Sequence, residues 1–241
     1  MPIAADLDHV AIALEKRAHA WPRYVRDLGG EWAGEGFAPG FVFSQVQFAN
    51  EMKVELLEPH DVAANDFLRR FVDRSGTGVH HVTFKVPSLP EACNRARALG
   101  YTVVGYDDHN RHWKEAFLHP REALGVVVQL VESDGTRPPG PWPAPPGPAD
   151  PPPPIAVLGL RTRARSAERA RMQWGSILRG TLVDDAAGSL VYGWPDSAMR
   201  IVVDLDAAAE EGPVTIEVAA SRPVALPAGP HPVLGAVFSR R

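Results

Sequence analysis

The chain has 241 residues, of which 45% are hydrophobic, enough for one large domain or two modest ones with a full core. The formal net charge of −4 at pH 7 gives no electrostatic reason to expect nucleic acid or an anionic membrane as a partner. The single cysteine, Cys93, excludes an intrachain disulfide framework and zinc sites built from cysteines.

The sequence also contains no recognisable sorting signal. Its N-terminus lacks a basic region followed by an apolar run, so we expect no signal peptide. The longest apolar run, at 126–131, is interrupted by Gln129 and is too short to cross a membrane. We therefore expect a soluble, cytoplasmic protein.

Residues 1–60 predict a module with the element order strand, helix, three strands. Apolar residues at helical spacing indicate the helix, and alternating β-branched and aromatic residues indicate the strands. The expected elements are strand Leu7–Leu14, helix Ala18–Leu28, and strands Glu31–Gly34, Phe41–Phe48 and Met52–Leu57. The last two strands flank residues 49–51, which predict a hairpin turn.

Residues 76–134 repeat this order after a connector at 61–74 in which we expect a short helix. The expected elements are strand Val79–Val86, helix Leu89–Leu99, and strands Tyr101–Tyr106, Trp113–Leu118 and Val126–Val131. The spacing also repeats, since Glu55 follows His9 by 46 residues and Gln129 follows His81 by 48. Matched order and spacing predict a duplicated βαβββ module and a domain that spans residues 1–134.

Residues 135–154 predict a linker. The part at 137–154 holds 11 of the 24 prolines of the chain. Proline lacks a backbone N–H and has a fixed φ, so this stretch cannot form a helix or a central strand. We expect a stiff, partly polyproline spacer between two domains.

Residues 155–241 show the module a third time, followed by the start of a fourth. The expected elements are strand Ile155–Arg163, helix Ala167–Leu178, strands Thr181–Val183, Leu190–Trp194, Met199–Leu205 and Val214–Ala219, and a last strand near Val233–Phe238. The fourth module is cut short, because a proline-rich turn stands where its helix would be. We expect a second, degenerate domain of the same type.

Four polar residues lie in the middle of apolar strands at equivalent positions of the first two modules. They are His9 and His81 on the first strands, and Glu55 and Gln129 on the last strands. A buried carboxylate such as Glu55 is costly unless it is paired or bound to a cation. Two imidazoles, a carboxylate and an amide oxygen suit a divalent first-row metal with open positions for substrate. We predict one metal site there, with Zn, Ni, Co, Mn or Fe all open.

The third module lacks this ligand set. Aligned on the first modules, Val157 stands where His9 stands, Val202 where Glu55 stands, and Pro213 at the position of His81. Because these residues offer no ligand atom, we expect residues 155–241 to bind no metal.

The motifs of the first half resemble a known family. They are LDHVAIA at 7–13, VELLEP at 54–59, GVHHV at 78–82, AFLHP at 116–120 and GVVVQL at 125–130. In these motifs residues 5–133 resemble the vicinal oxygen chelate superfamily, which includes glyoxalases, bleomycin-resistance proteins and dioxygenases, and are most similar to its methylmalonyl-CoA epimerase-like members. The resemblance implies an α+β fold in which paired βαβββ modules form a cupped mixed sheet around a metal. It places the metal on His9, Glu55, His81 and Gln129.

One departure from the epimerase pattern concerns charge. Such epimerases usually carry Gln on the fourth strand and Glu on the eighth, whereas Glu55 and Gln129 are exchanged here. Gln129 cannot accept a proton, so among the predicted metal ligands Glu55 is the candidate general base. Further acid/base candidates are His112, in a polar loop, and Glu115, on the seventh strand.

Two functions follow from this site. One is a divalent-metal-dependent isomerase or lyase that acts on a small acyl or vicinal-oxygen substrate through an enolate-like intermediate, with charge stabilised by the metal. The alternative is a non-catalytic protein of the same fold that binds or sequesters a small molecule. In both cases the partner is a small molecule, and a homodimer is possible.

Overall fold

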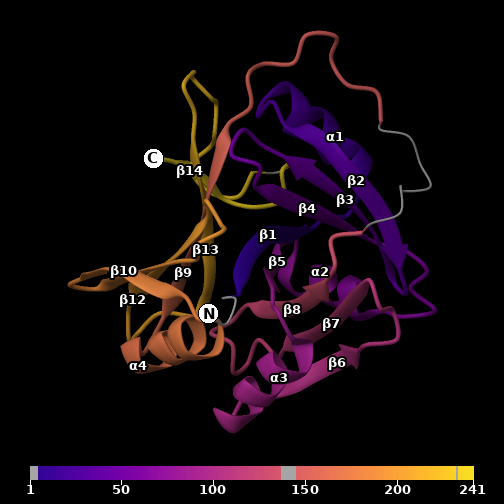
Figure 1. The fold of residues 1–241 in the computed structure, drawn as a ribbon. Helices are drawn as coiled ribbons and strands as arrows, with labels where there is room; N and C mark the ends of the chain where they lie inside the picture. The colour runs from indigo at the N-terminus through magenta and orange to yellow at the C-terminus, as the bar shows by residue number, and fades with distance from the viewer. Residues whose placement is uncertain (1–4, 137–144, 232) are drawn as a thin grey trace. The chain divides into compact units, whose positions relative to one another are not determined.

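The computed structural model describes residues 5–136, 145–231 and 233–241. It contains two mixed sheets and few helices, which are labelled in Figure 1. The first sheet has eight strands in the order β2-β3-β4-β1-β5-β8-β7-β6, and the second has six in the order β10-β11-β12-β9-β13-β14. The predicted α+β fold of paired βαβββ modules is confirmed.

The first sheet is built from the first two modules. Its elements are β1 (Asp6–Ala13), α1 (Arg17–Arg26), β2 (Glu31–Ala38), β3 (Phe41–Gln47), β4 (Lys53–Pro59), α2 (Phe67–Ser75), β5 (Gly78–Lys85), α3 (Leu89–Ala98), β6 (Val103–Asp107), β7 (Trp113–Leu118) and β8 (Val127–Ser133). Within each module the last strand lies beside the first, so β4 neighbours β1 and β8 neighbours β5. The duplication therefore puts β4, β1, β5 and β8 side by side at the centre of the sheet.

The second sheet follows the same plan with fewer strands. Its elements are β9 (Ala156–Ala164), α4 (Ala167–Ala170), the π-helix η1 (Arg171–Ile177), β10 (Thr181–Ala186), β11 (Ser189–Gly193), β12 (Arg200–Leu205), β13 (Gly212–Ala219) and β14 (Phe238–Arg240). Its strand order matches that of the first sheet from β2 to β8, and it has no counterpart of β7 and β6 among the described residues.

The backbone divides into two compact units. One comprises the described residues of Met1–His9, His81–Arg137 and Gly159–Val214, and the other those of Val10–His80, Pro138–Leu158 and Thr215–Arg241. The division falls inside β1, after His9, and inside β5, after His80. Both strands therefore contribute residues to both units.

Each unit has its own apolar packing. In the unit that contains α2, Leu68 and Val72 pack against Ala11, Ala13 and Leu57 of the sheet. In the other, Phe84 of β5 meets the rings of Trp174 and Trp194, with centroids 6.2 and 4.8 Å away.

Three predicted elements differ from the structure. The helix expected at 167–178 is only one α-helical turn followed by the π-helix η1. The strand expected at 31–34 continues to Ala38 past a register shift between Trp32 and Gly34. The last strand, expected at 233–238, begins only at Phe238. Before it the chain turns, because the His231 ring accepts the N–H groups of Val233 and Leu234.

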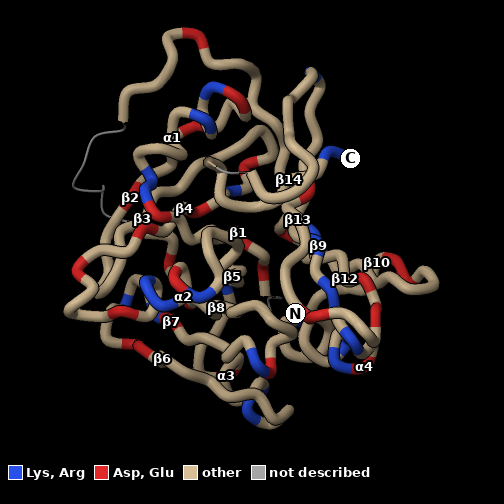
Figure 2. Tube along the Cα trace, turned by 180° about the vertical axis from the view of Figure 1, so that it is seen from behind, with Lys and Arg blue, Asp and Glu red and all other residues tan. Residues whose placement is uncertain are grey.

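Basic and acidic residues lie near one another along the strands and helices of the described chain (Figure 2). Figure 2 shows Lys and Arg residues interspersed with Asp and Glu along both sheets. None of the described helices has the length and apolar character that a membrane span requires.

Candidate metal centre

The centre of the first sheet brings together two histidines and one carboxylate. His9 lies on β1, Glu55 on β4 and His81 on β5, and these strands are neighbours in the sheet in the order β4-β1-β5. One ligand atom from each lies within 4.8 Å of the other two. The side chains are buried, with exposures of 1% for His9, 7% for Glu55 and 4% for His81.

Asp8 fixes the orientation of the His9 ring. Its Oδ2 lies 2.8 Å from His9 Nδ1, and its Oδ1 lies 2.6 Å from Lys85 Nζ. Burial alone would raise the pKa of Asp8, but the hydrogen bond and charge of His9, together with Lys85, hold this pKa far below its ordinary value. An ionised Asp8 makes His9 Nδ1 the donor. Nε2 then points away from Asp8, and a carboxylate that holds Nδ1 in this way commonly orients a metal-binding histidine.

Gln129 occupies the next central strand, β8, opposite Thr83 of β5. The Thr83 hydroxyl donates to Gln129 Oε1 at 2.6 Å and lies 2.9 Å from His9 Nε2. On the other side, Gln129 Nε2 donates to Glu115 Oε2 at 2.8 Å. The hydroxyl group of Thr83 thus lies between the fourth predicted ligand and His9.

Glu55 is held by an amide that the sequence reasoning missed. Gln45 of β3 lies directly opposite Glu55 in the hairpin and donates from Nε2 to Glu55 Oε1 at 2.9 Å. Gln45 is only 4% exposed. The signal was available, because a turn at 49–51 pairs positions equally distant from Asn50.

His80, the neighbour of His81, belongs to the opposite side of the strand. Its ring packs against Phe67 and Phe71, with centroids 5.7 and 4.8 Å away. Burial lowers the pKa of His80 to about 4, although the charge of Glu55 opposes the shift. His80 is therefore neutral at pH 7 and serves packing.

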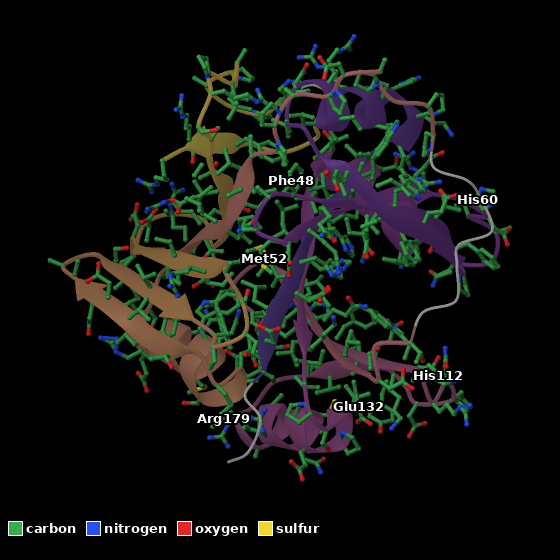
Figure 3. The ribbon with its side chains drawn as sticks, turned by 45° about the horizontal axis from the view of Figure 1, so that its top comes forward. Phe48, Met52, His60, His112, Glu132 and Arg179 are labelled. Carbon is green, nitrogen blue, oxygen red and sulfur yellow. The ribbon has the colours of Figure 1, made fainter. Side chains whose placement is uncertain are left out.

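The two remaining acid/base candidates lie in different surroundings. His112 lies in the turn before β7, labelled in Figure 3, with its Nδ1 2.7 Å from Asp134 Oδ2. Arg111 Nε donates to its other ring nitrogen at 2.8 Å. Glu115 accepts N–H bonds from Trp113 and Gln129. The structure thus brings Glu115 to the candidate centre and leaves His112 with Asp134 at the surface.

The donor set fits a divalent metal ion. Two imidazole nitrogens and one carboxylate oxygen from three adjacent strands form a usual three-ligand arrangement for a first-row metal with open positions. Gln129 offers a further oxygen atom, and Gln45 orients one oxygen of Glu55. The cluster His9–Glu55–His81 could therefore hold a metal.

Comparison with known proteins identifies the family. The model of the "Glyoxalase/Bleomycin resistance protein/Dioxygenase superfamily" matches residues 8–117. An uncharacterised protein of Bacillus subtilis, YqjC, is 30% identical over 135 residues, which cover 54% of this chain and 93% of that protein. The chain belongs to the glyoxalase/bleomycin resistance protein/dioxygenase superfamily.

Its relatives in this superfamily include an enzyme. The ethylmalonyl-CoA/methylmalonyl-CoA epimerase of Cereibacter sphaeroides is 29% identical over 130 residues, covering 52% of this chain and 95% of the epimerase. The crystal structure of a hypothetical protein from Staphylococcus aureus matches 98% of this chain and 99% of its own with a TM-score of 0.64 at 10% identity. That likeness shows the fold of the whole chain. The predicted resemblance to epimerase-like members is thus confirmed for about half the chain.

Proposed function

We propose that the protein is a divalent-metal-dependent isomerase or lyase that acts on a small acyl substrate, with His9, Glu55, His81 and Gln129 as its metal ligands. The observation that carries the proposal is the convergence of three buried ligand atoms within 4.8 Å. The epimerase relative, whose name specifies CoA thioesters, makes an acyl-CoA the first substrate class to test.

In this proposal the bound metal supplies Lewis acidity, which stabilises negative charge on a substrate oxygen. The chain's own residues do the rest. Asp8 keeps His9 in one ring orientation, and Gln45 holds one oxygen of Glu55. The other oxygen of Glu55 is the candidate base for a proton next to a carbonyl group. Glu55 is only 7% exposed, so little water reaches this carboxylate.

The alternative is a protein that binds a small molecule without turning it over. Two amides favour it, since Gln45 and Gln129 flank the three-ligand cluster and cannot accept a proton. An epimerase that works on both faces of a carbon acid needs a second base. Glu115, which contacts Gln129, is a further carboxylate, but it already accepts two hydrogen bonds.

The test is a titration of the metal-stripped protein with Co²⁺, followed by optical spectroscopy and calorimetry. We expect one Co²⁺ per chain with a ligand-field spectrum, and loss of this binding in His81→Ala. His60→Ala is the matched control, because His60 is an exposed histidine labelled in Figure 3. If the protein binds no Co²⁺, or if His81→Ala leaves binding intact, the metal-dependent function is wrong.

The second measurement separates the enzyme from the binding protein. We expect the metal-loaded protein to exchange the α-proton of a short-chain acyl-CoA for deuterium, and Glu55→Gln to abolish this exchange. Metal binding without exchange for a series of acyl-CoA esters would instead support the binding protein.

A further inference from the structure

Glu115 lies behind the predicted fourth ligand. Residues 117 and 129 are directly paired across β7 and β8, and so are residues 115 and 131. Because side chains alternate along a strand, Glu115 and Gln129 lie on the same face as diagonal neighbours. Gln129 Nε2 donates to Glu115 Oε2 at 2.8 Å, and Trp113 Nε1 donates to the same oxygen at 2.9 Å.

This contact determines which end of the Gln129 amide faces His9. An amide has a donor end and an acceptor end, and only the donor end can meet the carboxylate of Glu115. The oxygen then points the other way, where it accepts from Thr83 Oγ1 at 2.6 Å. In the flipped amide, an oxygen would face the carboxylate of Glu115 and an NH₂ group would face the metal ligands.

We propose that Glu115 is a positioning residue that fixes the Gln129 amide, so that Gln129 presents its oxygen to the metal. The inference deepens the proposed function and rests on its metal site. The negative charge of Glu115 then belongs to the site, although Glu115 lies on β7, one strand further from the sheet centre than Gln129 on β8. The role follows from the asymmetry of the amide, and a symmetrical carboxylate at position 129 would not need it.

That asymmetry supplies a sharp test. In the wild-type background we expect Glu115→Ala to weaken Co²⁺ affinity by about 10–100-fold, as for other residues that orient a metal ligand. Glu115→Gln keeps an acceptor for the Gln129 amide, and we expect it to stay within about threefold of wild type. In the Gln129→Glu background, Glu115→Ala should cause no loss of affinity, because either oxygen of Glu at 129 can bind.

The outcomes decide between three roles. A loss on Glu115→Ala that is equal in both backgrounds would overturn the positioning role and indicate a general structural effect. An unchanged affinity in Glu115→Ala would overturn it as well. If Glu115→Gln binds Co²⁺ normally but loses acyl-CoA proton exchange, Glu115 takes part in proton transfer and the positioning role is insufficient.

A second measurement needs no metal and separates this inference from the proposed function. The side-chain NH₂ of Gln129 should give two protected amide signals in a ¹⁵N–¹H spectrum, identified by their absence in Gln129→Glu. We expect Glu115→Ala to remove the protection and Glu115→Gln to keep it. If the Gln129 side-chain amide stays protected in Glu115→Ala, the inference is wrong even if the protein binds Co²⁺. If Glu115→Ala loses this protection as expected but the wild-type protein binds no Co²⁺, only the metal site is wrong.

Discussion

The two sheets of this chain share a plan and differ in what their central strands carry. The order β2-β3-β4-β1-β5-β8 of the first sheet is matched by β10-β11-β12-β9-β13-β14 in the second. The first has buried His9, Glu55 and His81 at its centre, and the second has Val157, Val202 and Pro213 at the positions that sequence alignment pairs with them. The same topology thus forms with and without this ligand set.

The difference shows that the fold does not depend on the ligand set. Val157 is fully buried and Val202 is 8% exposed, so the second sheet gains apolar burial where the first accepts the cost of burying polar groups. We propose that residues 155–241 form a degenerate domain without metal, and that its contribution is stability. The following predictions test this division of roles.

The largest effect should come from removing a large core side chain near the second sheet. Trp174 of η1 is fully buried and contacts Phe84. We expect Trp174→Ala to lower the free energy of unfolding by about 3–5 kcal/mol, because a cavity remains. Urea denaturation measures this change, and Val183→Ala is the control, since Val183 is 49% exposed. Where Trp174→Ala is still folded, a large drop in Co²⁺ affinity would contradict the division of roles.

The second effect comes from giving the first sheet the apolar centre of the second. We expect His9→Val with His81→Val to reduce Co²⁺ affinity by more than about 100-fold, since even residues that only orient ligands cost about 10–100-fold. Competition titration against a coloured chelator measures the affinity. Val202→Ala should leave it unchanged, and a Val202→Ala protein with weakened binding would show that the second sheet shapes the metal site.

A smaller effect is expected when the support of His9 is weakened. Asp8→Asn keeps an acceptor for His9 Nδ1 but removes the charge that pairs with His9 and Lys85. We expect about a tenfold loss of Co²⁺ affinity. Glu15→Gln removes a charge from an exposed carboxylate and is the control. Equal losses in both variants would mean that net charge alone determines the affinity.

The smallest effect concerns the histidine that the sequence places among the acid/base candidates. His112 contacts Asp134 and Arg111 at the surface, so we expect His112→Ala to change Co²⁺ affinity and acyl-CoA proton exchange by less than about threefold. A loss of exchange by about 100-fold with normal metal binding would instead support general acid/base catalysis by His112.

Much of the fold was predictable because it is duplicated. The spacing of His9 to Glu55 and of His81 to Gln129 located equivalent strands, and adjacent first strands follow from the pairing of modules. The π-helix η1 was not predictable, because over so few residues its buried positions, Gln173, Trp174 and Ile177, also suit an α-helix.

The contacts around the candidate ligands were less predictable than their strands. The Gln45–Glu55 pair follows from the hairpin register and could have been found. The amide of Gln129 could not, because its partners Thr83 and Glu115 come from two other strands, and side-chain orientation depends on all three. Sequence spacing locates a residue in a sheet, whereas hydrogen-bond partners follow from register between strands distant along the chain.

Among the described residues no strand lies beyond β14 in the second sheet, so β14 is one of its two edges and β10 is the other. A free strand edge offers unpaired N–H and C=O groups to other chains and invites aggregation. β14 has only three residues, Phe238–Arg240, and Arg240 and Arg241 place two positive charges at its end. A three-residue edge offers few unpaired backbone groups, so another strand pairs poorly with the second sheet at β14.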